Sequence, residues 1–340
     1  MATSKKVTLK DVAQMAGVSP ATVSLVVQGK GNLKDETRQS VIRTIEESGY
    51  SRRSPTMRQA KGLQFALVVD DISNPYFHEL YEGIDKILAE AGACTSILSS
   101  HDSVARQTKL LGDLWSSDIA GVVLVPATGT THLDLEEFEN RRRPLLMAVR
   151  RISQAPFNYI SANPMVGMQI ATEHLASLGH KKIGFVGGYQ KNFAYSERYA
   201  GFASSLMNHG LELNPAHIPN GGSTREFGRT AAETLLKLPN RPTALIGYND
   251  LVAIGMMDAI VAAGLEIGKD IAVIGYDDIP EAALQLVPLT SVATPASKLG
   301  EMVGIALQGW SLDHTVGSPL DITYPPRLVV RSSCGAQGDE

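Results

Sequence analysis

The most restrictive feature of the sequence is a regular alternation, from Phe65 onward, of short apolar runs with longer amphipathic stretches. The runs are FALVV, GVVLV, PLLMAV, KIGFVGG, ALIGYND and IAVIGYDD. Such runs are typical of parallel strands buried on both faces, whereas FHELYEGIDKILAEAG and GMQIATEHLASLGH have the apolar spacing of helices. Since parallel strands need crossover connections, the pattern predicts an α/β fold with doubly wound parallel sheets. Ligands of such sheets bind beyond the carboxyl ends of the strands.

The first 50 residues have a different pattern, which predicts a helix-turn-helix unit. A first helix begins after Thr8, which is followed three residues later by an acidic residue, as in a capping box. The turn Gly17-Val18-Ser19 separates it from a second helix, in which Ser19 is the N-cap and Pro20 the first helical residue. A three-residue turn between short helices is the spacing of a helix-turn-helix motif.

A third helix is expected from residue 35 to the glycine at 49, with acidic residues in its first turn. Apolar residues at helical spacing should bring the three helices together around one small core. These residues are Leu9, Val12, Ala13, Ala16, Val23, Val26, Val27, Val41, Ile42 and Ile45.

Charge is distributed unevenly along the chain. Residues 1–62 contain eleven Lys and Arg against five Asp and Glu, whereas the remaining residues contain 20 against 30. A small basic module on an acidic body predicts that the module binds a polyanion such as DNA, with a solvated basic face as the alternative. The second helix is the part expected to enter a major groove, because its outward residues are small or uncharged.

Residues 7–50, VTLKDVAQMAGVSPATVSLVVQGKGNLKDETRQSVIRTIEESGY, resemble the headpiece of the LacI/GalR family of bacterial transcription regulators. Within them, TVSLVVQGKG is similar to repressors associated with the maltose regulon. The resemblance implies a homodimer that binds a pseudo-palindromic operator on double-stranded DNA. Leu25 cannot make the bidentate contact of an arginine to guanine, so it should contact an apolar group such as a thymine methyl, unless it is a core leucine. The DNA-binding candidates are Thr8, Ser19, Pro20, Ala21, Thr22, Ser24, Leu25, Asn32 and Thr37.

The hinge expected at 51–62, after a headpiece of residues 1–50, departs from the family pattern. Its sequence, SRRSPTMRQAKG, is about two residues shorter than the resemblance implies. Pro55 can begin a short helix, and Met57 is then the residue best placed to wedge into a minor groove. A flexible basic linker is the alternative.

The body resembles the effector module of the same family, which is similar to periplasmic sugar-binding proteins. The motifs DDISNPYF, GHKKIGFVGG, ERYAGF, YND, VIGYDDIPEA and PLTSVATP occur in the expected order. The resemblance implies two subdomains that close on a ligand, with chain crossings near 162, 291 and 323. We expect residues 63–162 and 292–323 in one subdomain, and residues 163–291 and 324–340 in the other.

By motif, the resemblance implies that the ligand contacts Tyr76, Phe77, Arg198, Asn249 and Asp277. Aromatic rings pack on an apolar sugar face, while the polar groups bind hydroxyls. Each residue has a structural alternative: the aromatic residues can be core, Asn249 an N-cap and Asp277 a partner of a lysine, whereas Arg198 has little structural reason to be there.

Two further ligand candidates come from departures from the family pattern. Polar groups of the lactose-type pattern are missing near residues 125 and 149, where this chain has valines. Asp102 can replace one of them, and Arg150 can favour an anionic or phosphorylated ligand. The effector is therefore expected to be a sugar or a sugar derivative.

The sequence gives no support for an enzyme. GFVGG is not GxGxxG, and the eight histidines show neither HExxH nor HxH spacing, so no cofactor or metal is expected. No stretch reaches the roughly 18 apolar residues of a membrane span, no signal peptide is recognised, and Cys94 and Cys334 lack CxxC spacing, all of which favours the cytoplasm. The tail RSSCGAQGDE has no heptads, which favours a dimer over a tetramer. The alternative function is a cytoplasmic sugar receptor that does not bind DNA.

Overall fold

A computed structural model describes residues 9–19, 22, 23, 26, 35–48, 62–139, 144–152, 156–310 and 320–336. The chain separates into two compact units, Met1–Arg58 and Gln59–Glu340. Within the described ranges, no helix is long and apolar enough to cross a membrane.

The N-terminal unit contains α1 (Leu9–Met15) and α3 (Asp35–Ser48), and residues 22, 23 and 26 between them are also helical. Gly17 follows α1 with φ +65°, a conformation that ends helices and that glycine adopts without strain. The Ser19 hydroxyl accepts a hydrogen bond of 3.1 Å from the Thr22 backbone N–H, so the predicted N-cap is confirmed.

The small core of this unit agrees with the prediction except at one residue. Ile42 was expected on the inner face of the third helix, but its exposed fraction is 38%. It directly follows the fully buried Val41 and points about 100° away from it, so the inner face of α3 includes Val41 while Ile42 lies outside it. The buried residues are Val12, Ala13, Val23, Val26 and Val41, with Ala16, Val18 and Ile45 packed against them; the side chains of Leu9 and Val27 lie outside the described part.

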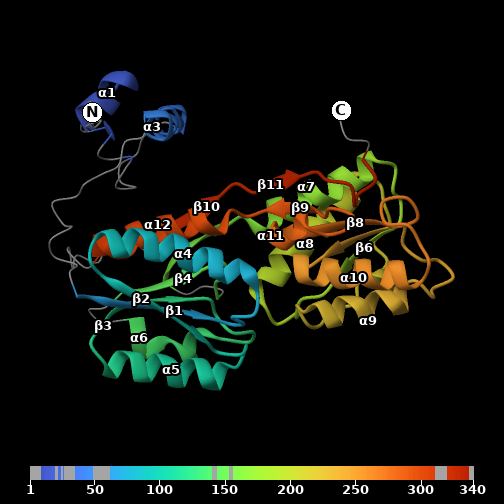
Figure 1. The fold of residues 1–340 in the computed structure, drawn as a ribbon, viewed down its shortest axis with the longest axis horizontal. Coiled ribbons are helices and arrows are strands. Elements are labelled where there is room, and N and C mark those ends of the chain that lie inside the picture. Colours follow the sequence, from blue (N-terminus) through green and yellow to red (C-terminus); the bar gives the residue numbers. More distant parts are fainter. Residues whose placement is uncertain are drawn as a thin grey trace. The chain divides into compact units, whose positions relative to one another are not determined.

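The C-terminal unit begins with a first lobe built on a six-stranded sheet of order β10-β5-β4-β3-β1-β2, in which all neighbours are parallel. Its strands are β1 (Gln64–Val69), β2 (Cys94–Ser99), β3 (Ile119–Leu124), β4 (Leu145–Ala148), β5 (Asn158–Ala162) and β10 (Asp321–Tyr324). The helices α4 (Pro75–Glu90) and α12 (Ala296–Trp310) cover one face; α5 (Val104–Ser116), the 3-10 turn η2 (His132–Asp134) and α6 (Glu136–Glu139) lie on the other side (Figure 1). A Cβ atom at Gly83 or Gly300 would collide with the backbone of the facing helix, so glycine permits the close contact of α4 with α12.

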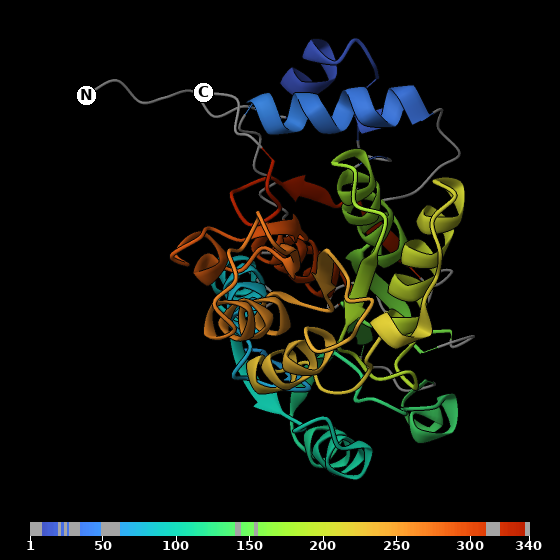
Figure 2. The same cartoon turned by 90° about the vertical axis from the view of Figure 1, so that its right-hand side faces the viewer.

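The second lobe of this unit has a five-stranded sheet of order β11-β9-β8-β7-β6, parallel except for the β11–β9 pair. Its strands are β6 (Ile183–Val186), β7 (Ala244–Gly247), β8 (Ala272–Asp277), β9 (Thr290–Ala293) and β11 (Arg327–Val329). The helix pair α7 (Pro164–Ser177) and α8 (Phe193–Asn208) packs on one face, and α9 (Arg225–Leu235) with α10 (Asp250–Ala262) on the other, while η3 (Pro215–His217) and α11 (Pro280–Ala283) are short (Figures 1 and 2). The α/β fold with parallel sheets is confirmed.

The chain passes between the two lobes three times. The passages lie between β5 and α7 at 162–164, between β9 and α12 at 293–296, and between β10 and β11 at 324–327. The expected crossings were 162, 291 and 323. That the lobes are subdomains which move against each other remains a prediction.

Candidate functional site

The carboxyl ends of the parallel strands of both lobes meet at one cleft. Six of the seven predicted ligand residues line a single small pocket of about 20 Å³ there, and Asp102 lies behind it against Arg150. This is the place where doubly wound sheets bind ligands. The lining residues are Asn74, Tyr76, Phe77, Val149, Arg150, Ala194, Arg198, Tyr248, Asn249 and Asp277.

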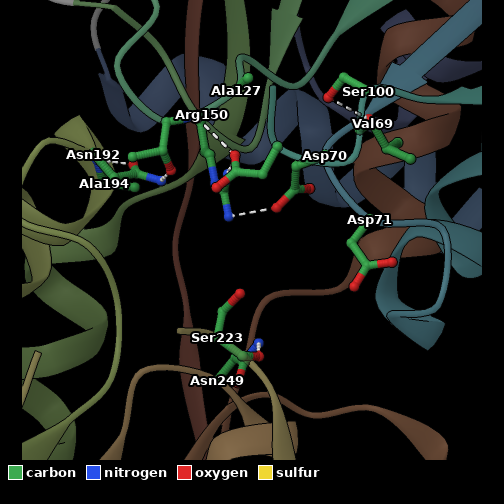
Figure 3. A network of polar contacts seen from close by, with 12 residues as sticks. Val69, Asp70, Asp71, Ser100, Ala127, Arg150, Asn192, Ala194, Ser223 and Asn249 are labelled. Carbon is green, nitrogen blue, oxygen red and sulfur yellow. Dashed lines mark hydrogen bonds and ion pairs between the residues drawn. The ribbon is translucent and has the colours of Figure 1, made fainter. Parts of the chain in front are cut away.

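Arg150 follows β4 and is the central charge of the first lobe's side of the cleft (Figure 3). Its Nη2 lies 2.7 Å from Asp70 Oδ2 and its Nη1 lies 3.6 Å from Asp102 Oδ1, while its side chain is only 9% exposed. Asp102 also accepts a hydrogen bond of 2.7 Å from the Thr128 backbone N–H. Burial raises the pKa of Asp70, and the neighbouring Arg150 opposes this rise. The cluster therefore keeps a buried arginine charged by pairing it with two carboxylates.

Arg198, in the second turn of α8, is the central charge of the second lobe's side. Its guanidinium lies 3.7 Å from the ring centroid of Tyr276 and 4.4 Å from that of Tyr248, and its Nη1 donates to the Tyr248 carbonyl. Asp277 Oδ1 is 3.8 Å from Nη2, an ion pair longer than a hydrogen bond. The interpretation that Arg198 has little structural reason is thus wrong, because two rings, a carbonyl and a carboxylate hold it.

Asp277, at the end of β8, titrates near neutrality. Burial raises its pKa to about 7, against the opposing charges of Arg198 and Arg150. The partner of this carboxylate is an arginine, whereas the structural alternative had been a lysine. Asp277 can therefore accept a hydrogen bond when ionised and donate one when protonated.

The remaining predicted ligand residues have the structural roles that were their alternatives, namely core packing and helix capping. Tyr76 and Phe77 lie in the first turn of α4, are each 3% exposed and belong to the core of the unit, although both also line the pocket. Asn249 is the N-cap of α10: its Oδ1 accepts from the Val252 N–H at 2.9 Å, and its Nδ2 donates to the Ser223 carbonyl at 3.0 Å. These roles do not exclude ligand contacts, but they occupy most of the polar atoms.

The backbone at the cleft is strained. Within the described ranges, the only residues other than glycine with positive φ are His101, Asp102, Val149, Asp277 and Asp278, all at the carboxyl ends of strands. Val149, at φ +64°, is the most unusual, because branched side chains disfavour this region strongly. Strained residues that gather at one cleft favour a functional role for it.

A larger pocket of about 190 Å³ adjoins the small one and shares Arg150 with it. Arg151, which lines it from the first lobe, forms an ion pair of 2.8 Å with Glu197 of the second. Asn192, the N-cap of α8, approaches Thr128 of the first lobe to 3.5 Å. The pocket is lined by Pro126, Ala127, Gly129, Thr130, Arg150, Arg151, Ile152, Lys191, Asn192, Phe193 and Ser196.

Sequence reasoning missed several residues of the cleft, among them Asp70, Asn74, Arg151 and Tyr248. Asp70 directly follows the apolar strand β1, and Tyr248 follows β7, so the rule that ligands bind beyond strand ends could have found both. Nothing local marked Arg151, whose partner Glu197 comes 46 residues later.

Only three of the predicted DNA-binding residues lie in the described part of the chain. The hydroxyls of Ser19 and Thr22 lie 2.9 Å apart on the exposed side of the N-terminal unit, and Thr37 is half-buried in α3. Thr8, Pro20, Ala21, Ser24, Leu25, Asn32 and Met57 lie outside the described residues.

Comparison with known proteins identifies both units. Residues 8–53 match the family described as bacterial regulatory proteins, lacI family, and residues 172–334 match the periplasmic binding protein-like domain. The regulator DegA of Bacillus subtilis is 31% identical over 335 residues, which cover 96% of this chain and 98% of that protein. The chain belongs to the lacI family of bacterial regulatory proteins.

Other relatives of this lacI-family chain are also regulators of transcription. The maltose regulon regulatory protein MalI of Escherichia coli is 29% identical, with 97% of this chain and 99% of MalI covered. Among solved structures, a complex of the regulator CelR with cellobiose is 27% identical, covers 96% of this chain and all of that chain, and has a TM-score of 0.72. The lac repressor dimer bound to operator is 26% identical, covers 98% of this chain and all of that chain, and also has a TM-score of 0.72. The predicted family and its two-part architecture are confirmed.

Proposed function

We propose that this lacI-family member is a sequence-specific repressor of transcription whose affinity for its operator is switched by a sugar or sugar derivative. The observation that carries the proposal is the cleft, where charged and aromatic side chains from the strand ends of both lobes line one pocket. Such convergence of polar groups on a concave site is typical of small-molecule binding. No catalytic step is proposed, and as a regulator of transcription the protein acts in the cytoplasm.

The size of the small pocket links ligand binding to movement of the lobes. Its volume of about 20 Å³ holds about one water molecule and no sugar. A sugar can reach Arg198 and Asp277 only if the lobes move apart or rotate. We infer that the ligand favours a state in which the lobes lie at a different angle, because a ligand shifts an equilibrium only when its affinities for the two states differ. A change in occupancy from 1:99 to 99:1 requires a difference of about 5.5 kcal/mol.

The proposed ligand contacts follow from the geometry of the cleft. Arg198 and Asp277 bind hydroxyls from the second lobe, Arg150 with Asp102 from the first, and the edges of Tyr76 and Phe77 face the apolar side of the ring. Asn249 keeps its capping role and contributes the remaining capacity of its amide. The relative CelR, in complex with cellobiose, supports a carbohydrate as the ligand class.

The proposed DNA contacts follow the helix-turn-helix unit of residues 1–50 and the hinge of 51–62. A homodimer is proposed, because a two-fold operator needs two headpieces, and the dimeric state of the lac repressor supports it. The contacting residues are Thr8, Ser19, Pro20, Ala21, Thr22, Ser24, Leu25, Asn32, Thr37 and Met57.

The proposal is tested by selecting random duplex DNA on the full-length protein and sequencing the bound fraction, without added sugar and with a panel of sugars. We expect a two-fold symmetric motif, bound with an affinity that falls roughly 10³- to 10⁵-fold between 50 and 200 mM salt if 6 to 10 phosphates are contacted. Absence of an enriched motif under every condition would refute the DNA-binding function and favour a receptor that does not bind DNA.

A further inference from the structure

The larger pocket has an electrostatic character that the proposed sugar site does not require. Among the described residues, its lining includes three basic side chains, Arg150, Arg151 and Lys191, and no carboxylate. The acidic partners of the two arginines are Asp70, Asp102, Glu197 and Asp321, none of which lines the pocket. Lys191 forms no ion pair with any of the described residues. The charged side chains among the described lining residues are therefore all basic.

Unsatisfied hydrogen-bonding groups point to the same chemistry. Among the described residues that line the two pockets, three buried side-chain atoms lack a hydrogen-bond partner: Arg150 Nη1, Arg151 Nε and Arg198 Nε. All three are donors. Arg150 is only 8% exposed, and Nη1 has just the 3.6 Å contact with Asp102, which exceeds hydrogen-bond length. Buried donors without partners are costly, so a ligand rich in acceptors would be bound selectively.

Helix α8 adds a further favourable field. It has 16 residues and begins at Phe193, with Asn192 as its N-cap, and both residues line the pocket. In Figure 3, the Arg150 side chain extends into the space between Asn192 on one side and Asp70 on the other. The N-terminus of a helix carries partial positive charge and free N–H groups, which stabilise anions.

We infer that the larger pocket is a subsite for an anionic group of the effector, bound by Arg150, Arg151, Lys191 and the N-terminus of α8. The inference rests on the proposed function, because it assigns a chemical class to the effector of the same cleft. A phosphate ester fits best, since its three terminal oxygens accept several hydrogen bonds at once, and a carboxylate has the same chemistry with fewer acceptors. The effector is then a phosphorylated or acidic sugar, whose neutral part faces Arg198 and Asp277.

The experiment measures binding of inorganic phosphate and, separately, of acetate to the full-length protein by calorimetry at constant ionic strength. Lys191→Gln removes the unpaired charge, and Ser196→Glu places a carboxylate at an exposed position of the pocket wall, in the first turn of a helix, where an acidic residue is favourable for folding. Lys181→Gln is the matched control, because Lys181 is an exposed lysine of the same lobe outside the pocket. The Lys181→Gln variant retains the basic N-terminal unit, so it also shows how much phosphate that unit binds.

We expect the wild type and Lys181→Gln to bind one phosphate per chain in the cleft, Lys191→Gln to bind it about tenfold more weakly, and Ser196→Glu to lose it. Unchanged urea midpoints for the variants would show that they are folded. Binding of acetate in preference to phosphate, with the same response to the variants, would assign the subsite to a carboxylate.

No saturable phosphate or acetate binding, or equal binding by all three variants, would overturn the inference. That result is distinguishable from failure of the proposed function, because operator selection is performed on the same preparations. A protein that selects a two-fold operator but binds no anion is a repressor with a neutral effector. A protein that binds the anion but selects no operator retains the subsite and loses the proposed function.

Discussion

The ion pair between Asp70 and Arg150 should contribute strongly to the stability of the first lobe. Its atoms lie 2.7 Å apart, and both side chains are less than a tenth exposed. Replacing Arg150 by methionine leaves Asp70 as a buried charge without a close partner. Removal of one member of a buried pair costs about 3–5 kcal/mol, and the 29% exposed Asp102 adds little because water can solvate it.

The assay is urea unfolding followed by tryptophan fluorescence. The two tryptophans, Trp115 in α5 and Trp310 at the end of α12, both belong to the first lobe, so fluorescence reports on the lobe that contains the pair. With a slope of about 2–3 kcal/mol per molar urea, the expected loss lowers the midpoint by roughly 1–2.5 M.

Lys86→Met is the matched control for burial. Lys86 and Glu301 lie 2.6 Å apart in the same lobe, but the lysine side chain is 61% exposed. Exposed pairs contribute little, so this midpoint should stay close to that of the wild type. The double variant Asp70→Leu with Arg150→Met should be more stable than Arg150→Met alone, since it removes the unpaired charge. A midpoint for Arg150→Met no lower than that of Lys86→Met would refute the reasoning.

Three further predictions concern the cleft and the DNA. Because the pKa of Asp277 is about 7 in the folded chain and near 3.8 when unfolded, the folded state binds the extra proton between these values, so stability should fall as pH rises from about 4 to 7. In the Asp277→Asn variant this decrease, of up to about 4 kcal/mol, should be missing from urea unfolding across the pH range, and identical profiles would contradict the assignment. Arg198→Ala should retain operator affinity in a gel-shift titration and lose the response to effector; a retained response would remove Arg198 from the ligand site. Leu25→Ala should relax sequence preference at one operator position. Lys30, a basic residue after the second predicted helix, is expected to contact a phosphate, so Lys30→Ala should weaken all sequences alike, and a uniform loss in both would argue against base contact by Leu25.

The strands with a continuous apolar run were predictable, including the edge strand β6, whereas the other edge strands and the inner strands β5 and β9 were not. The runs that predicted strands correspond to β1, β3, β4, β6, β7 and β8, which are buried almost throughout. Three of the four edge strands, β2, β10 and β11, have the sequences CTSILS, DITY and RLV and are half-exposed, so they lack a continuous apolar run. β9 is buried yet contains Thr290 and Ser291, whose hydroxyls are hydrogen-bonded to Arg331 and Asp250. Its burial depends on distant partners that no local pattern contains.

In the cleft, too, features with a local sequence pattern were predictable, and features that depend on distant residues were not. A rule based on strand ends and a family resemblance found Arg150, Arg198 and Asp277, because each occupies a fixed place after a strand or within a helix. The residues that pair with these three side chains could not be predicted from the sequence. Asp70 and Arg150 are 80 positions apart in the chain and meet because β3 lies between β1 and β4 in the sheet. The interpretation of Arg198 failed for the same reason, since Tyr248 directly follows β7 and Tyr276 lies in β8, both far from Arg198 in the sequence.

Arg150 connects the stability of the first lobe to the choice of ligand. Val149, with its positive φ, precedes it, and the turn there carries the arginine from the end of β4 to a position between Asp70 and the N-terminus of α8. Asp70 pairs closely with one nitrogen of the guanidinium, while Nη1 has no hydrogen-bond partner in the pocket wall. Because Asp70 already provides the countercharge, an incoming anion binds an arginine whose position is fixed in advance, and little side-chain entropy is lost on binding. The pair that stabilises the lobe thus also preorganises the proposed anion subsite, and this preorganisation acts against the repulsion between Asp70 and the anion.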